Sequence, residues 1–247
     1  MTISAPTLAQ SLANPTRFMA LSAALLPWLS GLTAVVMAIG LYQALVTSPP
    51  DYQQGQLVRI MYVHVPCAWL SMLGYLLIAA SSFGLLVFRH PLADVSARAA
   101  APIGATFTAL ALATGSLWGK PTWGTYWVWD ARLTSMLLLF LLYLGLIALR
   151  NSVEDESAGA KLTAILSLVG VSLLPVIKFS VEWWQTLHQP STQFTSTLDA
   201  SIRTPLLINA LGYSLLFACL HLKAMRNEIL RRRLKSLQMA AVREAGG

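Results

Sequence analysis

Six long runs of apolar residues, separated by short polar stretches, dominate the hydrophobic pattern of the chain. Most are close to the roughly 20 residues that a helix needs to cross the hydrocarbon core of a membrane. The runs predict spanning helices at residues 20–46, 64–88, 101–117, 132–149, 162–180 and 204–222. Pro102 should lie in the first turn of the third helix, where a missing N–H costs little, and Pro175 should kink the fifth. The pattern predicts an all-α integral membrane protein.

Composition supports the same class. Of the 247 residues, 56% are hydrophobic and 11% are charged, against about a quarter charged in a soluble domain. The first apolar run is too long for the core of a cleaved signal peptide, and no A-x-A-like cleavage site follows it. We therefore expect it to remain as the first spanning helix.

The positive charge is unevenly distributed and predicts an orientation. The net charge is +7, and seven of the 17 Lys and Arg residues lie from Lys223 onward. We expect a membrane domain at 1–223 and a basic tail at 224–247 that lies on anionic lipid headgroups, rather than a nucleic-acid-binding surface. With six spans, 12 of the 17 basic residues lie on the side of both termini. The positive-inside rule then places both termini in the cytoplasm and residues 118–131 outside.

The stretch "WGKPTWGTYWVWDARLTS", which starts at Trp118, is the most unusual part of the sequence. Four of the eight tryptophans lie between Trp118 and Trp129. Gly119, Pro121 and Gly124 predict that this segment is not helical. An aromatic belt at the membrane interface is the alternative explanation, but a belt is spread over all span ends. Concentration in one external segment favours a binding surface.

The four histidines separate by side of the membrane. His90 and His221 fall at cytoplasmic ends of spans, where an ordinary interfacial role is the better interpretation. His64, near the start of the second span, and His188, in the last external loop, lie on the side of the aromatic segment. Each alone would be unremarkable. Together they predict a haem site with both histidines as iron ligands, because imidazole is a usual haem ligand.

The other candidate site residues surround this pair. Aromatic rings match the flat, conjugated face of a porphyrin, and the candidates are Trp118, Trp123, Tyr126, Trp127 and Trp129. Arg132, with Lys120 as a second candidate, would meet the propionates. Asp130 has three interpretations: a metal ligand, a partner of Arg132, or the N-cap of the fourth helix, which is the most economical.

The sequence lacks the motifs of two kinds of chemistry, covalent haem attachment and ATP hydrolysis by a P-loop. The sequence has no CxxCH for covalent attachment of c-type haem to this chain. It also has no G-x-x-x-x-G-K-[ST], so we expect no P-loop ATPase activity and no enzyme.

Four stretches of the sequence resemble those of a known protein family. "WGKPTWGTYWVWDARLTS" resembles the WWD domain of haem-handling proteins in cytochrome c biogenesis, and "DYQQG", "YVHVP" and "SVEWWQTLHQ" resemble the CcmC family. The resemblance covers nearly the whole chain, with an external WWD segment at 118–132. Tyr126 stands where the family more often has Trp, which should preserve the stacking surface.

The resemblance implies a function and partners. The protein would hold haem b transiently on the periplasmic face of the bacterial inner membrane, with His64 and His188 as axial ligands. It would deliver that haem to the haem chaperone CcmE and work with CcmD and the CcmA/CcmB transporter subunits. Two alternatives stay open: a transporter that moves haem across the bilayer, and a b-type electron-transfer cytochrome.

Overall fold

In a computed structural model that describes residues 14–188 and 198–245, every named element is helical. Residues 189–197, which belong to the predicted external loop that carries His188, and both chain ends fall outside these residues. The elements are α2 (Pro15–Tyr42), η1 (Gln43–Thr47), η2 (Gln56–Ile60), α3 (Met61–Phe88), α4 (Ala93–Trp123), α5 (Ala131–Ser152), α6 (Glu156–Gly170), α7 (Leu173–Trp183) and α8 (Ala200–Ala245). Six helical segments are long and apolar enough to cross a membrane. The prediction of an all-α, six-span membrane protein is confirmed.

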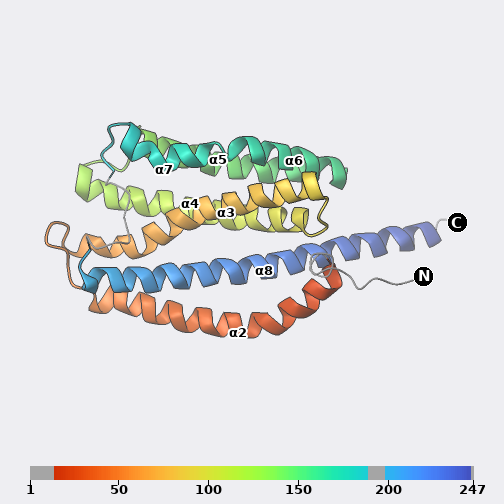
Figure 1. Ribbon diagram of the computed structural model, residues 1–247, viewed down its shortest axis with the longest axis horizontal. Helices are drawn as coiled ribbons and strands as arrows, with labels where there is room; N and C mark the ends of the chain where they lie inside the picture. Colours follow the sequence, from red (N-terminus) through yellow and green to blue (C-terminus); the bar gives the residue numbers. More distant parts are fainter. Residues whose placement is uncertain (1–13, 189–197, 246–247) are drawn as a thin grey trace.

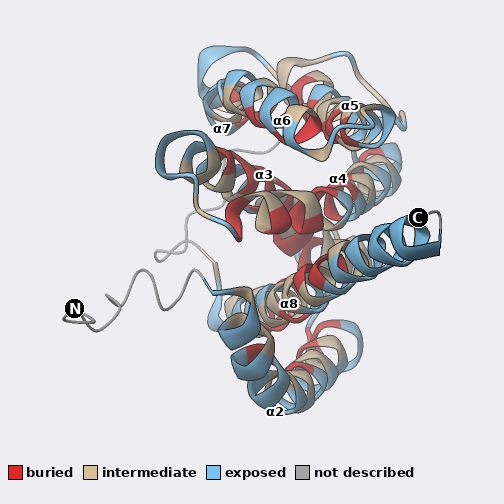
Figure 2. Ribbon diagram, turned by 90° about the vertical axis from the view of Figure 1, so that its right-hand side faces the viewer, coloured by how far each residue is buried: buried red, intermediate tan, exposed pale blue. Residues whose placement is uncertain are grey.

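The helices form three layers (Figure 1). α3 and α4 make the central layer, α5, α6 and α7 cover one side of it, and α8 with α2 covers the other. The end-on view in Figure 2 shows the same order, with buried residues concentrated around α3 and α4. The start of α2 and the end of α8 lie towards the same end of the bundle. The opposite end carries the start of α3, the α4–α5 connection and the segment after α7.

The core between the layers is held by close helix contacts around Tyr143. This ring is fully buried, and its hydroxyl donates a hydrogen bond to the carbonyl of Ser71, 2.7 Å away. Gly104 makes room for it, because a Cβ at that position would collide with the Tyr143 ring. Replacing this glycine would therefore push α4 away from α5.

The third span is longer than predicted, and two predictions about it were wrong. α4 begins at Ala93 and ends at Trp123, so Pro102 lies inside the helix rather than in its first turn. The alanine-rich stretch at 93–101 supports the earlier start, because alanine is the strongest helix former. At the other end, residues 118–123 are helical, and only 124–130 of the predicted non-helical segment leaves the helix. Pro121 stands in the last turn of α4, three residues before Gly124 ends the helix.

The fifth span, which was expected to kink at Pro175, is divided into two helices. α6 ends at Gly170 and α7 begins at Leu173, two residues before Pro175. In a continuous helix the ring of Pro175 would clash with the carbonyl of Val171, four residues earlier. Val171 lies in the break between the two helices, so α7 can begin just before the proline without that clash.

The last helix passes the predicted boundary at 223 without interruption. α8 runs unbroken from Ala200 to Ala245, so the basic tail continues the sixth span as helix. Met225 and Ile229 of this extension are buried against Leu92, Val95 and Ala99. This packing explains why the first part of the tail stays attached to the bundle.

Candidate functional site

His64 and His188 come together at one end of the bundle. His64 lies one turn into α3, as expected from its position near the start of the second span, and His188 lies in the segment after α7. Their ring centres are 6.3 Å apart, with an angle of 37° between the ring planes. The structure therefore joins the two histidines that the sequence placed on one side of the membrane.

The His64 ring is held in one protonation form by α4. Its Nδ1 lies 3.1 Å from the Thr114 hydroxyl. That hydroxyl donates its single hydrogen to the carbonyl of Leu110, 2.6 Å away, so it must accept from His64. The proton of a neutral His64 is therefore on Nδ1, and Nε2 keeps a lone pair for a metal. Gly115 provides space for the ring, because a Cβ there would lie 2.9 Å from His64 Cε1.

The segment that carries His188 is tied to the start of α5. Asp130 is the N-cap of α5, and its Oδ1 accepts a 2.8 Å hydrogen bond from the N–H of Leu133. Its other oxygen accepts a short hydrogen bond from the Thr186 hydroxyl. Thr186 Oγ1 in turn accepts the backbone N–H of His188 at 3.0 Å. The capping interpretation of Asp130 is confirmed, and the same carboxylate positions the His188 segment.

Two tryptophans of α4 flank the histidine pair. Trp118 meets the His64 ring edge to face, with ring centres 5.7 Å apart, and Trp123 lies 6.3 Å from the ring of His188. The Trp118 indole N–H donates to the side-chain oxygen of Gln54 at 2.9 Å. Gly119 allows the Trp123 ring to lie against the helix, since a Cβ there would come within 2.9 Å of it. Because residues 118–123 are helical, the indole rings of Trp118 and Trp123 both lie beside the two histidines.

The three later aromatic residues occupy different positions. Trp127 lines the same cavity as the histidines, whereas Tyr126 and Trp129 do not and are 55% and 75% exposed. Trp129 meets Trp127 edge to face, with ring centres 5.4 Å apart. Gly124, with a φ of +80°, ends α4 in the left-handed conformation that glycine adopts readily and turns the chain towards these residues.

A cavity of about 190 Å³ joins these residues. Besides the histidines and three tryptophans, its lining includes Trp69 and Met72 of α3 and Met136 of α5. Trp69 lies outside the aromatic segment at 118–129, so the sequence pattern did not include it among the candidates, yet it forms part of this wall. The cavity is thus mainly apolar and aromatic, and both imidazoles belong to its lining.

Two cations line this cavity, and one of them differs from the sequence-based candidates. Arg132 Nη1 donates to the carbonyl of Ile177 at 2.8 Å, while its buried Nε has no acceptor among the described residues. The buried indole N–H of Trp127 also has none there. Lys178 is the second cation of the lining. Lys120 instead donates to the carbonyl of Gly124 at 3.0 Å and lies over the Tyr126 ring.

Sequence reasoning missed the residues that support the site: Gln54, Thr114, Gly115, Lys178 and Thr186. For two of them a signal was present. Thr114 and Gly115 lie four and three residues before Trp118, which places all three on one face of a helix. That signal was hidden because residues 118–123 were expected to be non-helical. Gln54 and Thr186 lie within the stretches "DYQQG" and "SVEWWQTLHQ" that carry the family resemblance, but nothing local indicated their supporting roles. Lys178 gave no signal, since its role depends on how α7 returns to α5.

Comparison with known proteins now identifies the family. The family model described as "Heme exporter protein C" (CcmC) matches residues 8–240. A protein named "Heme exporter protein C" from Bradyrhizobium diazoefficiens is 62% identical over 231 residues, which are 92% of this chain and 88% of the relative. One of the same name from Escherichia coli K12 is 47% identical over 219 residues, 89% of each chain. A putative cytochrome c biosynthesis ccmC-like mitochondrial protein from Marchantia polymorpha is 43% identical, over 80% of this chain and 85% of the relative. The chain belongs to the CcmC family of haem-handling membrane proteins in cytochrome c maturation.

Proposed function

We propose that the protein binds haem b at the His64–His188 cavity on the periplasmic side of the bacterial inner membrane and delivers it to the haem chaperone CcmE. In this proposal haem is cargo, and the chain is a handling protein rather than an enzyme. CcmD and the CcmA/CcmB transporter subunits are its partners, and ATP hydrolysis takes place on those subunits.

The observation that carries the proposal is the separation of the two imidazoles. A metal–imidazole bond is about 2 Å long, so an iron held between two imidazoles sets their ring centres roughly 6 Å apart. The ring centres of His64 and His188 are 6.3 Å apart. The protonation form of His64, set by Thr114, leaves Nε2 available to the iron.

The rest of the cavity fits the chemistry of a porphyrin. Its aromatic walls match the conjugated disc. The buried Nε of Arg132 and indole N–H of Trp127 lack acceptors among the described residues, and a buried donor without an acceptor is costly. A propionate would supply the missing acceptors, and Lys178 would stand near the second carboxylate. Arg132 and Lys178 thus balance the two negative charges of the cargo.

Orientation completes the proposal and has its own test. Tyr52 is 91% exposed near the histidine end of the bundle, Val242 is 72% exposed near the opposite end, and both native cysteines are buried. In intact spheroplasts, a membrane-impermeant thiol reagent should label Tyr52→Cys and spare Val242→Cys. The reverse pattern would place the haem site in the cytoplasm and contradict the proposal.

Delivery is tested by the yield of chaperone with covalently attached haem in cells that carry variants of this chain. His64→Ala and His188→Ala should each reduce that yield strongly at unchanged membrane levels of the protein. His90→Ala, at the opposite end of the bundle, should leave the yield unchanged. Normal yields from both external variants would refute the proposed function.

A further inference from the structure

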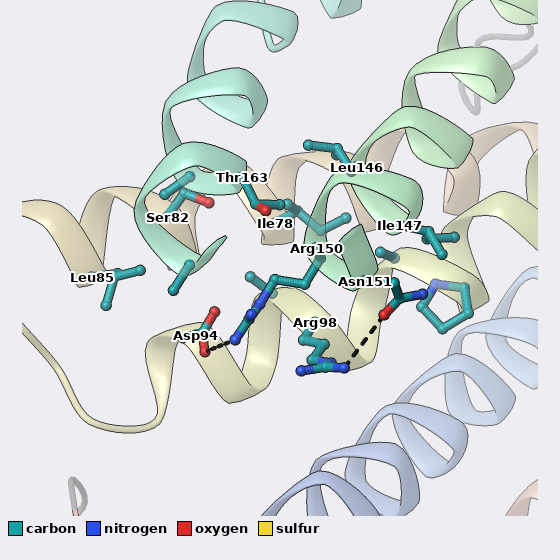
Figure 3. A pocket seen from close by; sticks show the side chains of 15 residues that line it. Ile78, Ser82, Leu85, Asp94, Arg98, Leu146, Ile147, Arg150, Asn151 and Thr163 are labelled. Atoms are coloured by element: carbon teal, nitrogen blue, oxygen red, sulfur yellow. Dashed lines mark hydrogen bonds and ion pairs between the residues drawn. The ribbon is translucent and has the colours of Figure 1, made fainter. Parts of the chain in front are cut away.

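A second cavity lies at the opposite end of the bundle, between α3, α4, α5 and α6 (Figure 3). Its volume is about 160 Å³. Apolar side chains form much of the wall, among them Leu85, Pro102 and Leu146, and the charged residues of the lining are Asp94, Arg98 and Arg150. The cavity is separate from the histidine site, and the proposed function does not use it.

Arg150 is the central polar residue of this cavity. It is only 5% exposed, and its Nη2 donates to Asp94 at 3.1 Å and to Glu156 at 3.3 Å. Gly159 leaves space for the guanidinium, since a Cβ there would lie 2.9 Å from Nη1. Its buried Nε has no acceptor among the described residues. A buried cationic donor without an acceptor favours a ligand that carries acceptor oxygens.

Positive charge exceeds negative charge around this cavity. Three carboxylates, those of Asp94, Glu156 and Glu228, are shared among five cations: Arg98, Arg150, Arg231, Arg232 and Lys235. Arg98, which Figure 3 shows beside the cavity, lies 3.6 Å from Glu228 and 3.8 Å from Glu156, longer than a direct hydrogen bond. Its Nη2 reaches Asn151 at 3.4 Å. The local excess of two positive charges is therefore not neutralised within the cluster.

We propose that this cavity is a binding site for a phosphate-bearing anion, supplied by the headgroup of an acidic phospholipid. Arg98 and Arg150 would hold the phosphate, and the apolar wall would take the first part of an acyl chain. Basic pockets between membrane helices are suited to acidic headgroups, and guanidinium groups match the paired oxygens of a phosphate. A lipid would contact both the two arginines and the apolar wall, whereas free inorganic phosphate would contact only the arginines. The apolar wall therefore favours a lipid as the source of the phosphate.

The test uses the full-length protein in a neutral detergent and native mass spectrometry. Dioleoyl phosphatidylglycerol, dioleoyl phosphatidylcholine and inorganic phosphate are titrated separately. Arg98→Gln removes one cation, and Ala97→Leu fills the cavity without changing any charge. Arg243→Gln and Ala241→Leu, in the exposed last turns of α8, are the matched controls. Size-exclusion profiles establish that each variant is folded.

The proposal predicts one tightly retained phosphatidylglycerol per chain and much weaker retention of phosphatidylcholine with the same acyl chains. Arg98→Gln should weaken that binding about fivefold, Ala97→Leu should abolish it, and both controls should bind as the wild type does. If inorganic phosphate alone binds, and Arg98→Gln and Ala97→Leu both weaken that binding, the cavity is an anion site whose ligand is a soluble phosphate rather than a lipid. Equal binding of both lipids without phosphate binding would overturn the proposal. Acidic-lipid binding that both cavity variants leave intact would also overturn it.

Discussion

The Thr186 hydroxyl donates a short hydrogen bond to the Asp130 carboxylate. Through this bond the segment that carries His188 is attached to the N-terminus of α5, because Thr186 also accepts the backbone N–H of His188 at 3.0 Å. A helix N-terminus stabilises the negative charge of Asp130. A rigid element thus determines where a loop histidine lies.

Removing the hydroxyl of Thr186 should therefore weaken haem binding without removing a ligand. Thr186→Val keeps the shape of the side chain but loses both hydrogen bonds. Residues that orient metal ligands typically contribute about 10- to 100-fold in affinity, so we expect at least about a tenfold loss. Thr186→Ser, which keeps the hydroxyl, should recover most of it. Haem titration of the purified variants measures the effect, and wild-type affinity in Thr186→Val would show that this link is dispensable.

A second prediction concerns the space beside His64. In Gly115→Ala the new Cβ would lie 2.9 Å from His64 Cε1, so the ring must shift from its present position beside His188. We expect haem content to fall severalfold while the protein still inserts into the membrane. Gly145→Ala is the matched control, because nothing lies within 4 Å of its added Cβ. Haem per protein, measured by absorbance after purification, should fall in the first variant and not in the second. Equal haem content would contradict the assigned position of His64.

The six spans and the two histidines could be predicted from the sequence, whereas the helical geometry beside them could not. Apolar runs located all six spans, because a long uncharged run has few alternatives to a membrane helix. The sides of the membrane and the family resemblance predicted that His64 and His188 belong to one site, and the structure places their rings side by side. The geometry of 118–123 was missed because Gly119 and Pro121 were interpreted as turn residues. In the structure Gly119 instead makes room for the Trp123 ring within a helix.

The extension of α8 shows a second limit of sequence reasoning. Residues after Lys223 are polar and basic, which indicated a separate tail. In the structure Arg231 and Arg232 form ion pairs with Glu156 of α6 and Asp94 of α4. These contacts join residues far apart in the sequence, so no local pattern predicted them.

Arg132 provides a prediction about the propionates. Loss of a hydrogen bond to a charged group costs about 1.5–3 kcal/mol, so Arg132→Gln should weaken haem binding at least about tenfold. The dimethyl ester of haem lacks the carboxylate charges and should bind the variant and the wild type alike. Titration of both porphyrins against both proteins separates charge recognition from a general loss of structure. An equal loss for the ester would indicate that Arg132 acts only through its bond to Ile177.

The aromatic residues allow a matched comparison within one short segment. Trp123 and Trp127 line the cavity, whereas Trp129 is 75% exposed and does not. Replacing both lining residues with Ala should abolish haem retention, since each ring provides about 1–3 kcal/mol of apolar contact. Trp129→Ala should retain most of the haem. Haem content at matched protein levels decides the point. Undiminished haem in the double variant would favour an aromatic belt over a haem platform.

The coordination state of the bound iron tests the central claim most directly. Electron paramagnetic resonance of the oxidised haem complex should show a low-spin signal in the wild type, because two imidazole ligands would keep the ferric iron low spin. His64→Ala and His188→Ala should each convert the signal to high spin, and added imidazole should restore low spin in both. An unchanged low-spin signal in either variant would show that this histidine does not ligate the iron, and would contradict the account of the site.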